Sequence, residues 1–240
     1  MLLRREQIIY YRKYLVLKKP LSIILIVLFL DQCVKFWVKT HMYLGQEFHI
    51  SGNWFIIHFT ENNGMAFGME LLQGPAGKLF LSLFRIFAVI GIGFYLYTLL
   101  KRKSNPKLLT SMSLIFAGAM GNIFDSIFYG KIFSSSEYQV ASLFPAEGGY
   151  ANFLHGKVVD MFYFPIIEGH FPSWFPIWGN EDFVFFRPVF NIADSSISIG
   201  VFLILIFQST IFHQEKKEEI HTENPSDDFL RPESFVQVQK

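Results

Sequence analysis

Two aspartates lie in surroundings where a charged group is costly. Asp194 lies near the start of an apolar run that ends at Phe212 and is long enough to cross a membrane, and Asp160 lies between Val159 and Met161. A carboxylate in a membrane segment costs several kcal/mol, so it is usually retained for a function. Two carboxylates that meet share one proton, which suits hydrolysis: the ionised group takes a proton from water while the protonated group polarises the scissile carbonyl. The pair therefore predicts an aspartyl hydrolase acting on a substrate in the bilayer.

Asparagines at helical spacing precede two of the aspartates. Asn191 lies three residues before Asp194, and Asn122 lies three residues before Asp125, so each pair shares one helix face. An asparagine can donate hydrogen bonds that hold a buried carboxylate in one rotamer and stabilise its charge. Asn and Asp also cap the starts of helices, and this explanation stays open for Asn191, almost the first residue of its span. It fails for Asn122 and Asp125, because they lie near a helix end of the wrong dipole sense.

Other polar motifs have simpler explanations beside the functional one. Asp31 and Lys35 are four residues apart, in the favourable acid-then-base order for a helix. An internal ion pair explains them at least as well as catalysis, and we interpret Asp31 as support for the site. Residues 54–59 are aromatic and β-branched and predict a strand on the membrane surface, and residues 61–67 (ENNGMAF) contain the turn signal Asn-Gly. Residues 118–121 (GAMG) supply small side chains for close helix packing.

The composition is that of a polytopic membrane protein. The chain is 51% hydrophobic with 29 Phe, and only 17% of its residues are charged, against about a quarter in soluble domains. A net charge of +1 gives no excess for nucleic acid. The single cysteine, Cys33, excludes a disulfide framework and a Cys-based metal site, and the seven His have no metal-type spacing. We therefore expect no metal, no cofactor and no nucleic-acid partner.

Four stretches reach the roughly 20 apolar residues that a membrane-spanning helix needs. They are residues 20–40, 79–100, 108–129 and 190–212. The first could be mistaken for a secretory signal, but Asp31 and Gln32 replace the small residues of a cleavage site, and three further spans follow. We therefore interpret it as a retained span. The tail 213–240 is charged and poor in apolar residues, so we expect it to be disordered.

The placement of Lys and Arg predicts the orientation. The N-terminal segment 1–19 and the loop 101–107 are rich in them. The long loops 41–78 and 130–189 contain only Lys78, Lys131, Lys157 and Arg187. By the positive-inside rule, both termini and the short loop are cytoplasmic and the two long loops face outward. At about 1.5 Å per helical residue, the polar residues of the third and fourth spans then lie near their outer ends. Topology alone gathers the unusual polar residues at one face.

Five motifs follow one another along the chain: DQCVK at 31–35, NNGMAF at 62–67, GAMGNIFD at 118–125, VVDM at 158–161 and FNIADS at 190–195. In their order they resemble the motifs of the lipoprotein signal peptidase (signal peptidase II) family, and the resemblance covers residues 20 to about 212. The resemblance implies an α-helical polytopic membrane protein with four transmembrane helices, a small outer-face β-cradle on the first outer loop, and extended outer loops. It also implies that Asp160 and Asp194 are the catalytic dyad. The residues expected to support the site are Asp31, Lys35, Asn62, Gly64, Asn122, Asp125 and Asn191.

The resemblance also implies the reaction. Members of the family remove the signal peptide of diacylglyceryl-modified prolipoproteins just before the lipidated cysteine, without metal or cofactor, at the outer face of the cytoplasmic (inner) membrane. Prolipoproteins, membrane lipids and globomycin-type lipopeptide inhibitors are the implied partners, and the expected state is a monomer. The chain departs from the family at Ser126, where Arg is common, and in the longer stretches at about 130–157 and 165–188, whose role the sequence leaves open.

Two other classes of function compete with the peptidase. A proton-coupled transporter would use isolated Asp and Asn residues as a relay, but here the polar residues gather at one face, and four spans show no evident internal repeat. A catalytically inactive binder on the same frame is the other alternative, and the presence of both Asp160 and Asp194 weighs against it.

Overall fold

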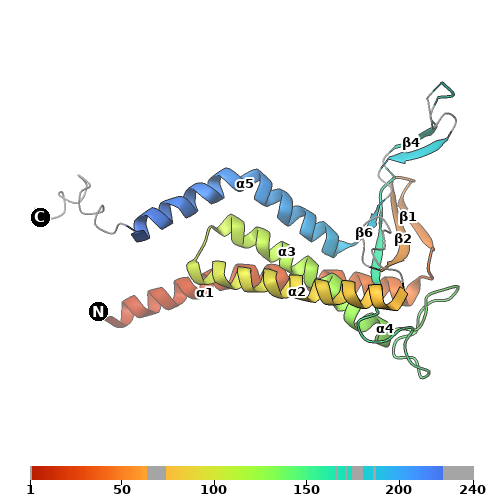
Figure 1. The fold of residues 1–240 in the computed structure, drawn as a ribbon, viewed down its shortest axis with the longest axis horizontal. Helices are drawn as coiled ribbons and strands as arrows, with labels where there is room; N and C mark the ends of the chain where they lie inside the picture. Colours follow the sequence, from red (N-terminus) through yellow and green to blue (C-terminus); the bar gives the residue numbers. More distant parts are fainter. Residues whose placement is uncertain are drawn as a thin grey trace, which may run out of the picture.

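The computed structural model describes residues 2–63, 74–165, 167–170, 172–174, 181–185 and 188–223. The expected supporting residue Gly64 lies outside these ranges. The described part forms a bundle of long helices with a small antiparallel sheet at one end (Figure 1). The start of α1 and the end of α5 both lie at the opposite end of the bundle from the sheet (Figure 1).

The helices confirm the expected class of fold. Four of them in the described ranges are long and apolar enough to cross a membrane, over Lys18–His41, Ala76–Arg102, Pro106–Ile132 and Ile192–Ile211. The elements themselves are α1 (Leu2–His41), α2 (Gly74–Arg102), α3 (Pro106–Phe124), which continues through the π-helical turn η2 (Asp125–Tyr129) into α4 (Gly130–Ile132), and α5 (Ile192–Glu223). The chain is a helical polytopic membrane protein.

The third span is the centre of the bundle. In its apolar window 61% of the residues are buried within the protein, against 17% in each of the other three spans, because α3 packs against α1, α2 and α5. Its contact with α5 is close: a side chain at Gly118 would collide with the carbonyl oxygen of Ala193, and one at Gly200 would approach the carbonyl oxygen of Ser111 to 2.7 Å. Small residues allow this backbone approach, which fixes the start of α5 against α3.

Both long segments that connect the spans contribute strands to the sheet, whereas the sequence suggested a cradle on the first segment alone. Its strand order is β1-β2-β3-β6, and every neighbouring pair is antiparallel. The strands are β1 (Glu47–Ser51), β2 (Phe55–Asn62), β3 (Val158–Tyr163) and β6 (Val189–Phe190). The β-branched and aromatic residues around Asp160 pair with β2, so this aspartate lies on a strand. A separate hairpin of β4 (Ile167–His170) and β5 (Asp182–Phe185) projects away from the bundle (Figure 1).

The first inserted segment, residues 133–157, folds back onto the helix ends. Its backbone bonds to α1 through Ala141 N–H and the Lys39 carbonyl at 3.2 Å, and Ser136 accepts from Leu44 N–H at 2.9 Å. A buried apolar cluster joins it to the sheet and the spans, and it consists of Val38, Met42, Phe59, Tyr129, Phe133, Ala141, Val159 and Met161. This cluster packs the sheet end of the bundle around the polar residues described below.

The last helix extends further than the sequence indicated. The apolar span was expected to end at 212 with a disordered tail behind it, but α5 continues to Glu223. The residues after His213 are mainly Gln, Glu and Lys, which have high helix propensity, and an existing helix is easily extended. Residues 224–240 lie outside the described ranges.

Candidate active site

The start of α5 is held by a reciprocal cap between Asn191 and Asp194. The Asn191 side-chain oxygen accepts a hydrogen bond from the Asp194 N–H at 2.8 Å, and the Asp194 carboxylate accepts one from the Asn191 N–H at 3.3 Å. This is the pattern of a capping box. The capping explanation for Asn191 is therefore correct, and it does not compete with a role in the site, because the same cap fixes the orientation of the Asp194 carboxylate.

Asn191 also joins the two aspartates of the predicted dyad. Its side-chain nitrogen donates to Asp160 Oδ1 at 2.7 Å, while its backbone nitrogen donates to Asp194 as described. Each carboxylate has a further asparagine donor: Asn62 of β2 reaches Asp160 Oδ2 at 3.3 Å, and Asn122 of α3 reaches Asp194 Oδ1 at 2.7 Å. The buried Asn191 thus joins the aspartates of β3 and α5. Asn62 and Asn122 each hold the other oxygen of one carboxylate.

The environment of Asp160 favours a protonated carboxyl. Burial, and after it the nearby Asp194 charge, raise the pKa of Asp160 to about 7, although the hydrogen bond from Asn62 acts in the opposite direction. Near neutral pH, Asp160 therefore holds a proton for a large part of the time. A carboxyl that keeps a proton beside a second carboxylate is the arrangement that aspartyl hydrolysis requires.

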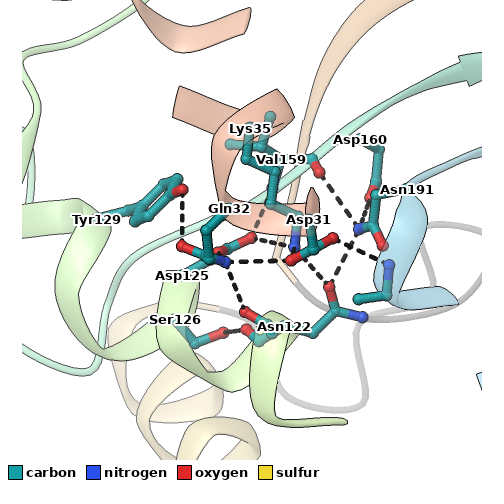
Figure 2. A network of polar contacts seen from close by, with 12 residues as sticks. Asp31, Gln32, Lys35, Asn122, Asp125, Ser126, Tyr129, Val159, Asp160 and Asn191 are labelled. Atoms are coloured by element: carbon teal, nitrogen blue, oxygen red, sulfur yellow. Dashed lines mark hydrogen bonds and ion pairs between the residues drawn. The ribbon is translucent and has the colours of Figure 1, made fainter. Parts of the chain in front are cut away.

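Lys35 is the centre of the polar network behind the dyad (Figure 2). The ion pair expected with Asp31 is present, with 2.9 Å between Lys35 Nζ and Asp31 Oδ2. Asp125 is a second partner at 2.7 Å, and Asn122 accepts from the same ammonium group at 2.9 Å. The side chains of Lys35, Asp31 and Asp125 are fully buried. Lys35 thus neutralises two carboxylates and orients Asn122, whose other side donates to Asp194.

Asp31 connects the first span to the start of the last. Its Oδ1 accepts a hydrogen bond from the Ala193 N–H at 2.9 Å, which satisfies one of the free N–H groups in the first turn of α5. A side chain at Gly121 would approach Asp31 Oδ2 to 2.6 Å, so this contact depends on glycine in α3. These contacts place Asp31 between the first span and the start of α5, and its supporting role stays a prediction.

Asp125 connects the network to the strand of the catalytic candidate. It accepts from the Val159 N–H at 3.3 Å, one residue before Asp160, and from Gln32 Nε2 at 3.0 Å. Gln32 in turn accepts a hydrogen bond from the Tyr129 hydroxyl at 3.1 Å (Figure 2). The sequence analysis did not include Gln32 and Tyr129 in the site. An amide inside an apolar span was the available signal for Gln32, whereas Tyr129 carries no signal that separates it from other buried aromatics.

Two positions differ from simple expectation. Ser126, where the family commonly has Arg, is buried and donates to the Asn122 carbonyl at 3.2 Å. A cationic side chain near the dyad comes instead from α2: Arg85 is half-buried, and its charge interacts with those of Asp194 and Asp160.

Acidic groups of the site lie beside cationic side chains in the described ranges. Within those ranges, no group of three or more His, Cys, Asp or Glu side chains is arranged to hold a metal ion. Asp31 and Asp125 have Lys35 as their cationic partner.

Four membrane-spanning helices that enclose two interacting aspartates beside a sheet define a membrane-embedded aspartic enzyme. The family model for signal peptidase (SPase) II matches residues 23–210, and the chain belongs to this family. A lipoprotein signal peptidase of Porphyromonas gingivalis is 59% identical over 189 residues, which cover 77% of this chain and 80% of that protein. One of Amoebophilus asiaticus is 36% identical over 212 residues, 87% of this chain and 85% of that protein.

Solved structures agree with the fold. A bacterial membrane enzyme solved by the in meso method at 2.3 Å resolution matches with a TM-score of 0.53 and 26% identity, over 80% of this chain and 88% of that chain. A second, at 1.9 Å resolution, matches with a TM-score of 0.51 and 27% identity, over 79% of this chain and 91% of that chain. The family resemblance, the fold class and the peptidase class expected from the sequence are confirmed, which decides against the transporter.

Proposed function

We propose that Asp160 and Asp194 are the catalytic dyad of this chain. As a member of the signal peptidase II family, the protein is an aspartic endopeptidase that cleaves lipoprotein signal peptides. The observation that carries the assignment of the dyad is the bridge by Asn191, which bonds Asp160 at 2.7 Å and Asp194 at 3.3 Å. Because the pKa of Asp160 is raised to about 7, this residue can hold the proton that the reaction needs.

The geometry supports a reaction with one proton on the pair. Asp160 is protonated and donates to the oxygen of the scissile carbonyl, while the Asp194 carboxylate takes a proton from water as the water oxygen attacks the carbonyl carbon. The tetrahedral intermediate then collapses: the carbon–nitrogen bond breaks, the amine nitrogen receives the proton held by Asp194, and the new carboxylic acid returns a proton to the pair. The three asparagines keep both carboxylates in place throughout.

The finer features of the substrate and the membrane setting belong to the same proposal. We expect cleavage just before a diacylglyceryl-modified cysteine, with the acyl chains in the bilayer beside the helices. The basic residues at 1–19 and 101–107 support cytoplasmic termini by the positive-inside rule, and the helix ends lie opposite the sheet (Figure 1). The site then faces outward from the cytoplasmic membrane, where a monomer would meet prolipoproteins, lipids and globomycin-type inhibitors.

The test is cleavage of a purified diacylglyceryl-modified prolipoprotein in vitro. Asp160→Asn and Asp194→Asn should each abolish cleavage, with the protein still folded, because asparagine preserves shape but cannot exchange the proton. Glu137→Gln, an exposed carboxylate in the same outer segment, is the matched control and should be fully active. Globomycin should inhibit the wild type. Near-wild-type turnover by either dyad variant would refute the assignment, and no cleavage by folded wild type would favour an inactive binder.

A further inference from the structure

A second buried ionic cluster lies beside the dyad network and has no part in the site described above. Lys39 Nζ contacts Glu61 Oε1 at 2.6 Å and Ser136 Oγ at 2.7 Å. The other oxygen of Glu61 contacts Lys157 Nζ at 3.3 Å. The side chain of Lys39 is fully buried and that of Glu61 is 5% exposed, whereas that of Lys157 is 33% exposed. The cluster therefore links α1, β2 and the inserted segment 133–157.

Aromatic rings enclose this cluster. The Lys39 ammonium lies 5.0 Å from the ring centre of Tyr150, 5.4 Å from that of Phe133 and 5.7 Å from that of Phe59, distances at which a cation interacts with a ring face. The Tyr150 hydroxyl also accepts from the Lys157 N–H at 2.8 Å. The inserted segment supplies two of these rings, so it closes over Lys39 and excludes water from the ion pair.

The cluster acts at the end of the strand pair that holds Asp160. Glu61 immediately precedes Asn62, the donor to Asp160, and Lys157 immediately precedes the first residue of β3. The β2–β3 pairing shifts its register between Ile57 and Thr60, so the pairing at the far end of the ladder does not by itself fix the register here. Glu61, bonded to both lysines, adds a side-chain constraint to the three backbone pairs on this side of the shift.

We propose that Lys39, Glu61 and Lys157 form an ionic clamp of positioning residues that keeps the Asn62 amide on Asp160. The proposal rests on the proposed dyad. The Asn62–Asp160 bond is 3.3 Å long, near the upper limit for a hydrogen bond, so a shift of β2 by a few tenths of an ångström breaks it. The inserted segment gains a role in this proposal, because it delivers Lys157 and the rings that desolvate the clamp.

The main test uses the double variant Lys39→Met/Glu61→Leu, which removes the buried pair together. Replacing both ions by apolar side chains leaves no unpaired buried charge, so folding should be retained, and the net charge near Asp160 does not change. We expect kcat to fall between about tenfold and a hundredfold with KM little changed. The alkaline limb of the pH–rate profile should move to higher pH, because the hydrogen bond that lowers the pKa of Asp160 is lost.

Matched variants separate positioning from general destabilisation. Lys131→Met, at an exposed position of α4 just before the inserted segment, should leave the profile unchanged. Lys157→Met should shift it in the same direction as the double variant but less. The other charged groups that act on Asp160, namely Asp194, Lys35 and Arg85, are intact in all three. If the clamp acts through Asn62, the clamp substitutions should add less than about twofold to the effect of Asn62→Ala.

The outcomes distinguish the clamp from the dyad. If Asp160→Asn is inactive and the double variant has a wild-type profile, the clamp alone is overturned. A lower melting temperature with an unmoved alkaline limb, or effects that multiply with Asn62→Ala, would also overturn it. If Asp160→Asn stays active, the dyad itself fails and the clamp has no target. A shifted limb that is absent in the Asn62→Ala background would establish the clamp.

Discussion

Two buried lysines one turn apart on α1 organise two different parts of the molecule. Lys35 faces the helical bundle, where its ion-pair partners are Asp31 of its own helix and Asp125 of the third span. Lys39 faces the sheet, where its ion-pair partner is Glu61 of β2. Both lysines are fully buried, with 0% of their surface accessible.

The two clusters hold different parts of the structure in place. The Lys35 cluster ties three spans together, since Asp31 also bonds the first turn of α5, and it contributes mainly to assembly of the bundle. The Lys39 cluster ties a strand and an inserted segment to the end of α1, and it contributes mainly to the placement of one hydrogen bond on Asp160. A buried ion pair is weak evidence for net stability, so only substitutions can separate these roles.

The largest expected effect is that of Lys35→Met. It leaves Asp31 and Asp125 buried without their cation, and breaking such a pair costs about 3–5 kcal/mol, a large share of the stability of a typical domain. Lys39→Met leaves only Glu61, which keeps Lys157. The yield and the melting temperature in detergent should therefore fall much further for Lys35→Met than for Lys39→Met. Equal losses for the two variants would contradict the division between the clusters.

A smaller effect, and a sharper comparison, comes from neutralising one carboxylate of each cluster. Asp31→Asn should cost about 1–3 kcal/mol of stability while kcat changes little, because the residue positions α5 and does not touch the reacting atoms. Glu61→Gln also leaves a buried lysine, Lys39, without its carboxylate, so it should lower the melting temperature as well, but unlike Asp31→Asn it should also lower kcat clearly. Melting curves and turnover of the two variants give the comparison. A stably folded but inactive Asp31→Asn would refute the supporting role.

Sequence reasoning identified much of the Lys35 cluster because its signals are local. Helical spacing paired Asp31 with Lys35, and the cost of membrane charge marked Asp125 and Asp194. Topology then placed these polar residues at one end of the bundle. The second partner of Lys35, and the bond from Asp125 to the Val159 N–H, needed the packing of three spans, which no spacing rule contains.

The Lys39 cluster was missed for a physical reason. A lysine in the last turn of a helix ordinarily complements the helix dipole, and a glutamate before an Asn-Gly turn is ordinarily solvated, so neither Lys39 nor Glu61 attracts attention alone. Their burial depends on the rings of Phe133 and Tyr150, about a hundred residues further along the chain. Inserted segments pack through contacts between residues far apart in the sequence, so sequence patterns do not reveal what they contact.

The smallest and most specific effect tests the end point of the clamp. Asn62→Ala removes the hydrogen bond that lowers the pKa of Asp160, so that pKa should rise further above its wild-type value of about 7. The reaction needs the proton on Asp160, so on the alkaline side wild-type activity is lost as the pH rises through about 7. In Asn62→Ala the loss should occur at higher pH, with kcat on the acidic plateau reduced about tenfold. A pH–rate series for both proteins on one lipidated substrate measures this.

The substitution leaves the charge of the site unchanged. An alkaline limb that moves to lower pH would therefore mean that Asn62 favours the protonated form of Asp160. The sheet would then act on the dyad in the opposite sense to the bundle.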